Sequence, residues 1–157
     1  MDREGQGDPR HELAEETAAA VETLASLWWR ASQEVSPRLS ALQLDALLIT
    51  RRNPGINLTG LAVAVGAAPP AVSRLCDRLE AAGLLRREAS PTSRREIELA
   101  LTPRGHKIID SLFARRSELL GNVLGRMAAS SQRELLAGLQ AFSEAVRAGR
   151  LDGSELS

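Results

Sequence analysis

The sequence has no tyrosine, one cysteine and two histidines among 157 residues. A single thiol, Cys76, cannot form an intrachain disulfide, and it cannot build a cysteine-based zinc site. His11 and His106 lie far apart in the sequence and have no neighbouring ligand cluster. We therefore expect neither a bound metal nor a cofactor.

Long apolar runs are also missing. No stretch approaches the roughly 18 consecutive apolar residues of a transmembrane helix, and residues 1–10 are polar. The sequence therefore predicts a cytoplasmic protein with no membrane partner. With 43% hydrophobic residues, residues 1–157 suit a single domain with its own core. No Gly-rich phosphate loop, nucleophile motif or paired carboxylate set is recognisable, so we do not expect an enzyme.

The formal net charge is zero, but the charges are segregated along the chain. Residues 1–49 contain four basic and nine acidic residues, whereas residues 50–107 contain ten basic and five acidic residues. A locally basic surface is what binding to nucleic acid phosphates requires, whatever the total charge. The middle of the chain is therefore the candidate region for nucleic acid binding.

Two short helices are predicted in this basic region. The first follows Asn57, which can cap it, and stops at Gly66. The second begins at Pro69 and ends before Gly83, and its apolar residues recur at helical spacing: Val72, Leu75, Cys76, Leu79 and Ala82. Two such helices joined by a tight turn are typical of a helix-turn-helix.

The polar face of the second helix contains the candidate DNA contacts Pro70, Ser73, Arg74 and Arg78. In a DNA major groove such side chains can reach base edges and phosphates. Asn57 and Thr59 are further candidates for phosphate contact, although Asn57 is also the expected cap. The alternative is an ordinary solvated face, in which Arg78 pairs with Asp77 or Glu80.

A β-hairpin is predicted next, with arms at Leu84–Glu88 and Glu96–Leu101. The second arm alternates, and Ile97, Leu99 and Leu101 are expected to point inward. The tip carries Arg94 and Arg95, which suit a minor groove or a phosphate backbone.

Longer helices flank this region. The apolar pattern predicts helices over residues 10–34, from a Ser40–Gln43 capping box to about Arg52, from Pro103 through Met127, and from a Ser131–Glu134 capping box to Gly149. One chain of this size cannot cover all of their apolar stripes. We therefore expect an isologous homodimer, which would present two recognition helices to one pseudo-palindromic DNA duplex.

Three motifs resemble the MarR (multiple antibiotic resistance regulator) family of winged-helix transcription factors. They are "LSALQLDALLITRRNPGINLTGLA", "AVSRLCDRLEAAGLLRRE" and "SPTSRREIELALTPRG", and together they run from Leu39 to Gly105. The resemblance implies a mainly α fold with a small β-hairpin. A winged helix-turn-helix lobe at residues 39–102 would lie between dimerisation helices at residues 10–35 and 103–149. It also implies a DNA-binding regulator, with repression released by a small ligand.

The chain departs from the family pattern at three places. Ser93 stands where the family usually has Asp before the wing arginines, so their acidic brace is missing. Ala68 replaces the usual Ser or Thr, which removes a cap worth about 1 kcal/mol. Val63 and Ala64 leave the outer face of the first motif helix apolar. A winged helix that docks a protein partner through that face is therefore the alternative function.

The resemblance also implies an effector pocket lined from the first, second and fifth helices. By this resemblance Trp28, Trp29, Leu47 and Phe113 are candidates for contact with a small-molecule effector, with plain core packing as the alternative for each. Some family members sense oxidants through a cysteine in the N-terminal region. Cys76 instead lies on the apolar stripe of the second motif helix, so we predict that it is buried and unreactive.

Overall fold

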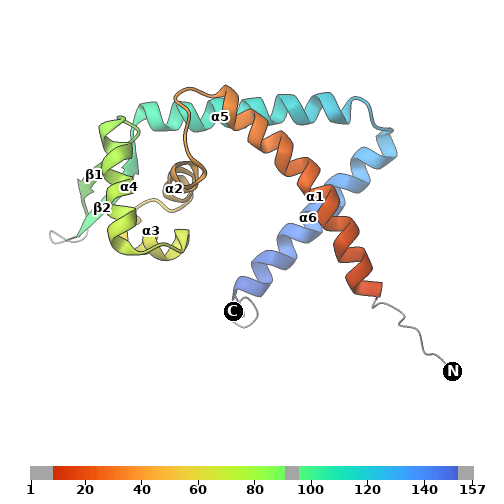
Figure 1. Ribbon diagram of the computed structural model, residues 1–157, viewed down its shortest axis with the longest axis horizontal. Helices are drawn as coiled ribbons and strands as arrows, with labels where there is room; N and C mark the ends of the chain where they lie inside the picture. Colours follow the sequence, from red (N-terminus) through yellow and green to blue (C-terminus); the bar gives the residue numbers. More distant parts are fainter. Residues whose placement is uncertain (1–8, 91–95, 152–157) are drawn as a thin grey trace. The chain divides into compact units, whose positions relative to one another are not determined.

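The computed structural model describes residues 9–90 and 96–151 of the chain (Figure 1). The elements are α1 (Pro9–Glu34), α2 (Ala41–Arg52), α3 (Leu58–Val65), α4 (Pro69–Ala81), β1 (Leu85–Ala89), β2 (Ile97–Leu101), α5 (Pro103–Leu124) and α6 (Ala129–Leu151). Contacts divide the chain into two compact units, Met1–Ser117 and Glu118–Ser157. None of the described helices is by itself long and apolar enough to cross a membrane.

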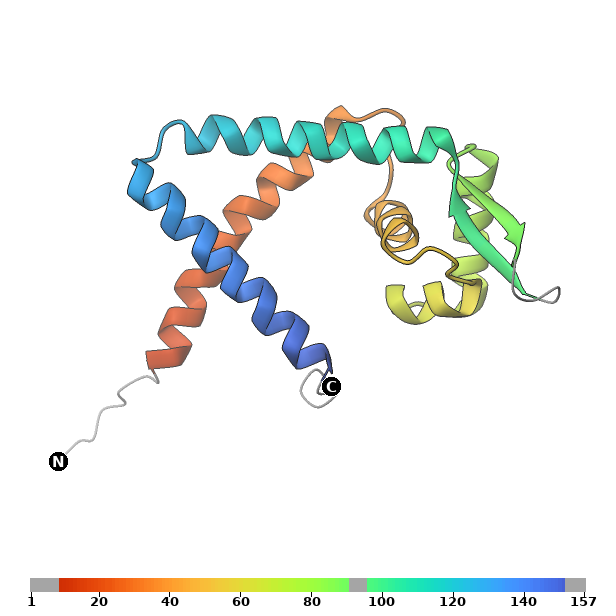
Figure 2. The same cartoon turned by 180° about the vertical axis from the view of Figure 1, so that it is seen from behind.

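The core of the first unit lies among α2, α3, α4, the hairpin and the start of α5 (Figure 2). Its side chains come from every one of these elements: Ala46, Leu47, Leu61, Ala62, Val72, Leu75, Cys76, Leu79, Leu84, Leu85, Leu99, Leu101, Ile108 and Ile109. This arrangement confirms the predicted fold class, which is mainly α with a small β-hairpin.

Most helix ends follow the residues that predicted them. Ser40 and Gln43 form the reciprocal capping box of α2. Asn57 caps α3, where its side-chain oxygen accepts a hydrogen bond from the Gly60 amide at 2.8 Å. Gly66 ends α3 in the left-handed region at φ 70°, which glycine adopts without a Cβ clash. Ala68 precedes α4 without a side-chain cap, as its apolar side chain requires.

The hairpin is antiparallel, with a register from Leu85 opposite Leu101 to Ala89 opposite Ile97. Leu99 and Leu101 are buried as predicted, but Ile97 is 56% exposed, so its predicted inward position is wrong. Ile97 begins β2 at the far end of the ladder, opposite the small side chain of Ala89. Alternation along a strand predicts burial only as far as the core extends beneath it.

The turn between α5 and α6 also differs from expectation. The α5 helix ends at Leu124, before Met127, and α6 begins at Ala129, so Ser131 lies within the helix and is not its cap. The Gln132 side chain donates to the carbonyl oxygens of Leu124 at 2.8 Å and Met127 at 3.1 Å. This amide satisfies carbonyl groups at the end of α5 and so sets the turn. At the other end α6 continues to Leu151, so the predicted stop at Gly149 is wrong as well.

The start of α5 is joined to the end of α4. The Thr102 hydroxyl donates to the Gly83 carbonyl at 2.6 Å and accepts from the Gly105 amide at 3.0 Å. The Arg104 guanidinium donates to the Ala82 carbonyl at 3.1 Å. Gly105 lies so close to this segment that an added Cβ would be 2.1 Å from the carbonyl oxygen of Leu84. The absence of a side chain at Gly105 therefore permits the contact.

Replacing Gly105 with alanine should destabilise the fold, because the carbonyl of Leu84 is backbone and cannot rotate away. We expect a loss of about 1–3 kcal/mol in the free energy of unfolding, as for other overpacked sites. Thermal denaturation measures it. Gly121→Ala is the matched control in the same helix, where an added Cβ meets nothing within 4 Å, and its midpoint should stay equal or rise. Equal midpoints for the two variants would contradict the close approach.

Candidate nucleic-acid interface

The chain bends by 108° between α3 and α4, within the range typical of a helix-turn-helix. One face of α4 is buried through Val72, Leu75, Cys76 and Leu79. The opposite face leaves Pro70, Arg74 and Arg78 exposed and Ser73 half-buried. The candidate contacts predicted on this helix therefore share one outward surface.

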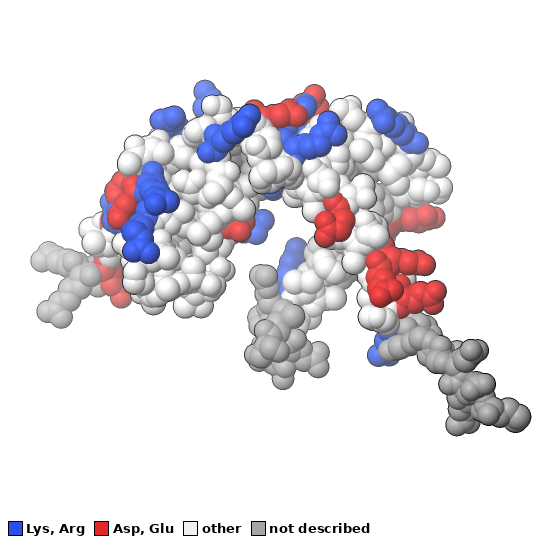
Figure 3. All heavy atoms as spheres, in the orientation of Figure 1, with Lys and Arg blue, Asp and Glu red and all other residues white. Residues whose placement is uncertain are grey.

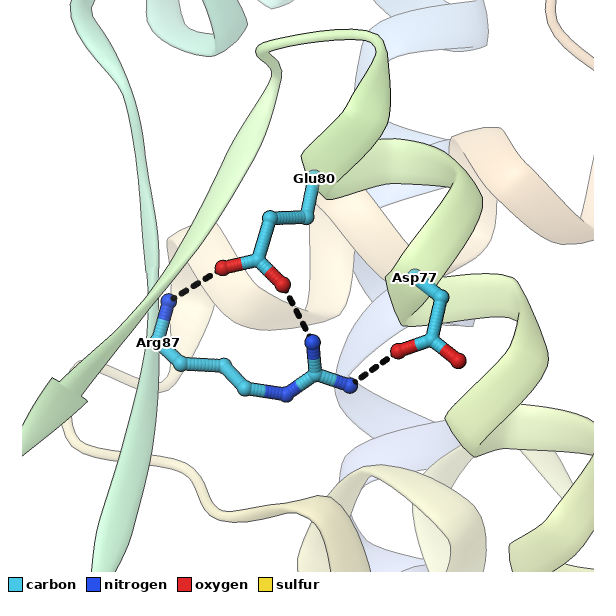
Figure 4. A network of polar contacts seen from close by, with 3 residues as sticks. All are labelled: Asp77, Glu80 and Arg87. Carbon is cyan, nitrogen blue, oxygen red and sulfur yellow. Dashed lines mark hydrogen bonds and ion pairs between the residues drawn. The ribbon is translucent and has the colours of Figure 1, made fainter.

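The guanidinium groups of Arg74 and Arg78 make no ion pair with any residue in the ranges that the structure describes. Sequence reasoning left open a pairing of Arg78 with Asp77 or Glu80, and the structure contradicts it. Both carboxylates are instead held by Arg87 on β1 (Figure 4). Figure 3 shows basic side chains grouped over α4 with acidic ones beside them.

Arg87 joins α4 to the first strand of the hairpin. Its guanidinium lies 2.6 Å from Oδ1 of Asp77 and also donates to Glu80, while its backbone amide donates to Oε1 of Glu80 at 3.4 Å. The hydrogen bond to Asp77 is the main cause that raises the pKa of Arg87. Sequence analysis did not identify this network. Without Arg87, the carboxylates of Asp77 and Glu80 would lose the cation that pairs with them beside the exposed face of α4.

A groove of about 360 Å³ lies between the first turn of α2 and the exposed face of α4. Its lining consists of Ser40, Leu42, Gln43, Ala71, Arg74, Leu75 and Arg78. Sequence reasoning assigned Ser40 and Gln43 only to a helix cap. The proximity of that cap to the two arginines is a tertiary feature that no local pattern signals.

The other candidates for DNA contact lie at the start of α3 or among residues that the structure does not describe. Asn57 and Thr59 are exposed at the start of α3, and the Asn57 side chain acts as its cap. The backbone of Asn57 also forms an isolated antiparallel β-bridge with Glu98 on β2. Arg94 and Arg95, with Ser93 before them, lie outside the described residues.

Two of the four candidates for effector contact, Trp28 and Phe113, lie near the same guanidinium group. The Arg116 guanidinium lies 5.4 Å from the ring centre of Trp28 and 6.0 Å from that of Phe113, in cation–π arrangements. Leu47 is fully buried in the core, whereas Trp29 is 60% exposed. A cavity of about 10 Å³ nearby is lined by Ser32, Val35, Pro37, Leu39, Leu44, Ile108 and Leu112, and by none of the four candidates.

Arg116 is a charged residue whose side chain is partly buried. Burial lowers its pKa, and the nearby positive charge of Arg52 adds to the effect. Its Nε is buried and has no hydrogen-bond partner within residues 9–90 and 96–151. The neighbouring Arg51 pairs with Asp110 at 2.9 Å and lies 5.3 Å from the centre of the Phe113 ring. Two guanidinium groups, those of Arg51 and Arg116, therefore lie against the Phe113 ring.

Comparisons with known proteins agree with this geometry. The family model described as MarR family matches residues 39–96. The HTH-type transcriptional repressor Rv2887 of Mycobacterium tuberculosis is 33% identical over 111 residues, which cover 64% of this chain and 76% of that protein. The crystal structure of RV1404 from Mycobacterium tuberculosis is 29% identical with a TM-score of 0.80, covering 90% of this chain and 97% of the other. A MarR family protein from Bacillus stearothermophilus has the same fold at 18% identity, with a TM-score of 0.76 and coverage of 90% and 99%.

Cys76 is buried on the inner face of α4, as predicted. Desolvation raises the pKa of its thiol, and the positive charge of Arg87 opposes that shift only in part. A higher pKa means less thiolate at neutral pH, and the thiolate is the reactive form. We therefore expect a thiol reagent to label the native protein much more slowly than the denatured protein.

The measurement is the labelling rate with and without denaturant. Equal rates would contradict the burial of Cys76. Loss of DNA binding in mild peroxide, prevented by Cys76→Ala, would support a redox sensor in its place.

Proposed function

This chain belongs to the MarR family of transcriptional regulators, and from this premise we propose that it represses transcription by binding a pseudo-palindromic DNA operator as a homodimer. It acts in the cytoplasm, without a cofactor and without catalysing a reaction. The observation that carries the proposal is the exposed face of α4. Two guanidinium groups there have no acidic partner among residues 9–90 and 96–151, while Arg87 pairs both nearby carboxylates.

The candidate residues divide by the part of DNA they reach. Arg74, Ser73 and Pro70 lie on the first turns of α4, the part of a recognition helix that reads base edges in the major groove. Arg78, one turn further on, binds the phosphate backbone, and Asn57 and Thr59 at the start of α3 contribute to the same strand. Arg94 and Arg95 on the wing bind the adjacent minor groove or backbone.

The dimer would form through α1, α5 and α6. The α6 helix alone exposes five large apolar side chains: Leu135, Leu136, Leu139, Phe142 and Val146. Leu13, Val21 and Trp29 on α1 are also exposed. A row of exposed apolar side chains along one helix marks an interaction surface. A twofold axis would then present two α4 helices to half-sites about ten base pairs apart.

Release from DNA would follow the binding of a small ligand beside Trp28, Leu47 and Phe113, with Trp29 at the outer edge of the site. The ligand must bind a DNA-incompetent arrangement more tightly than the competent one, since only that difference in affinity can shift the population. The half-buried charge of Arg116 between two rings supports a ligand site in this region.

A second candidate function rests on one observation. Val63 on α3 is 79% exposed, and Ala64 beside it is exposed as well. This apolar face could dock a protein partner, with no need for the arginines on α4 and on the wing.

Mutations at Arg74 and at Arg94 should weaken DNA binding in different ways. Arg74→Ala should weaken binding to the preferred duplex by about 1–3 kcal/mol and relax its sequence preference, since a guanidinium can pair with a guanine edge. Arg94→Ala should weaken binding to all duplexes alike. It should also lower the slope of log affinity against log salt by roughly 0.9 for each lost phosphate contact. Titrations at several salt concentrations, on a duplex selected from a random pool and on a scrambled duplex, measure both effects.

Unchanged affinity of Arg94→Ala on both duplexes would show that the wing does not touch DNA. Unchanged affinity of Arg74→Ala as well would shift the assignment to the protein-docking function.

The oligomeric state is a separate prediction. Sedimentation equilibrium at micromolar concentration should give the mass of a dimer, because exposed apolar residues on α1 and α6 need a partner surface. Phe142→Glu, at a side chain 61% exposed, should shift the equilibrium toward monomer without unfolding the chain. A wild-type monomer at that concentration would contradict the symmetric operator.

A further inference from the structure

Every polar side chain that lines the groove between α2 and α4 can donate a hydrogen bond. Its polar residues are Ser40 and Gln43 on the α2 side and Arg74 and Arg78 on the α4 side. From this lining we propose that the groove holds a backbone phosphate of the bound DNA. The DNA interface would thus extend from the recognition helix onto the first turn of α2. This inference rests on the function proposed above.

The α2 wall has donors left over from its own capping box. Oε1 of Gln43 accepts from the Ser40 amide at 2.9 Å, and Oγ of Ser40 accepts from the Gln43 amide at 3.2 Å. The cap therefore uses the acceptor atom of each side chain. The Gln43 Nε2 group and the Ser40 hydroxyl hydrogen make no other hydrogen bond to the described part of the chain. Both can donate to an anion without disturbing the cap.

The α4 wall supplies the charge, with Arg78 as the phosphate ligand and Arg74, proposed above to reach a base edge, beside it. Arg74 and Arg78 line the groove, and neither has an acidic partner within the described ranges. No aspartate or glutamate is among the lining residues, and the rest of the lining is apolar: Leu42, Ala71 and Leu75. Charge-assisted bonds from guanidinium to phosphate are among the stronger hydrogen bonds in proteins. A wall of this composition suits an anion and disfavours a cation.

The same surface identifies DNA as the source of the phosphate. Arg74 and Arg78 belong both to the groove and to the outward face of α4, so the groove is continuous with the proposed interface. A helix lying in the major groove is flanked by the sugar–phosphate backbone. The backbone beside α4 would therefore pass over the first turn of α2.

Gln43→Glu tests the proposal without removing the cap. A glutamate at this position of a capping box accepts from the Ser40 amide as glutamine does, so the thermal midpoint should stay within about 2 °C of wild type. Its second oxygen, however, would replace the Nε2 donor by negative charge facing the phosphate. We expect a loss of at least about tenfold in affinity, equal on selected and scrambled duplexes, because a backbone contact carries no sequence information.

Two further variants test the effect of added negative charge away from the groove and the contribution of the Ser40 hydroxyl. Ser111→Glu adds the same charge at an exposed site on α5 that does not line the groove, and it should bind almost as wild type does. Ser40→Gly removes the hydroxyl donor, and glycine is tolerated at a helix cap with little loss. It should weaken both duplexes by a smaller and equal factor. Fluorescence anisotropy of the full chain with labelled duplexes measures all of them, with Arg74→Ala as the positive control.

The outcomes distinguish this inference from the function on which it rests. Wild-type affinity of Gln43→Glu beside a weakened Arg74→Ala would overturn the groove site and leave DNA binding intact. An equal loss in Ser111→Glu would also overturn it, because the effect would then be one of total charge. Failure of the wild-type protein to select any duplex from a random pool would overturn the proposed function itself.

Discussion

The burial of one face of α4 is the constraint on which the rest of the structure depends. Val72, Leu75 and Cys76 face the core with little or no exposed surface. Because an α-helix repeats every 3.6 residues, this burial forces Ser73, Arg74 and Arg78 to the opposite side. The same residues that stabilise the fold therefore orient the side chains that we propose contact DNA. In that proposal, sequence preference depends on how firmly α4 is held.

The helix is held at its end and along its side. At the end, Gly83 turns the chain at φ 70° and its carbonyl accepts from the Thr102 hydroxyl, so the start of α5 and the end of α4 move together. Along the side, Arg87 connects two successive turns of α4 to β1. Exposed ion pairs contribute little stability individually, commonly below about 1 kcal/mol. Their effect here is geometric, because the proposed base readout would require side chains held on a rigid element.

Local patterns predicted the elements well and the tertiary connections poorly. Caps and periodicity located α2, α3 and α4 because each signal lies within a few residues of the feature it sets. The partner of Asp77 was not predictable in this way, since Arg78 is adjacent in sequence while the actual partner lies ten residues away on another element. The start of α6 was misplaced for a similar reason. The side chain of Gln132 bonds back to carbonyl groups at the end of α5, and that contact prevailed over a valid local capping pattern.

Charge placement explains how a chain of zero net charge can still bind a polyanion. Its overall charge gives no attraction at long range, and salt screens fields beyond about 8–10 Å under physiological conditions. Attraction must therefore arise within that distance, from charges adjacent to the DNA. Arg87 contributes indirectly, because pairing with Asp77 and Glu80 removes the local repulsion that these two carboxylates would exert. Arg74 and Arg78, which have no acidic partner among the described residues, would then act as unopposed charges when α4 lies against DNA as proposed. Of such short-range contacts, those to phosphates add affinity for any duplex, and only those to base edges add discrimination among sites.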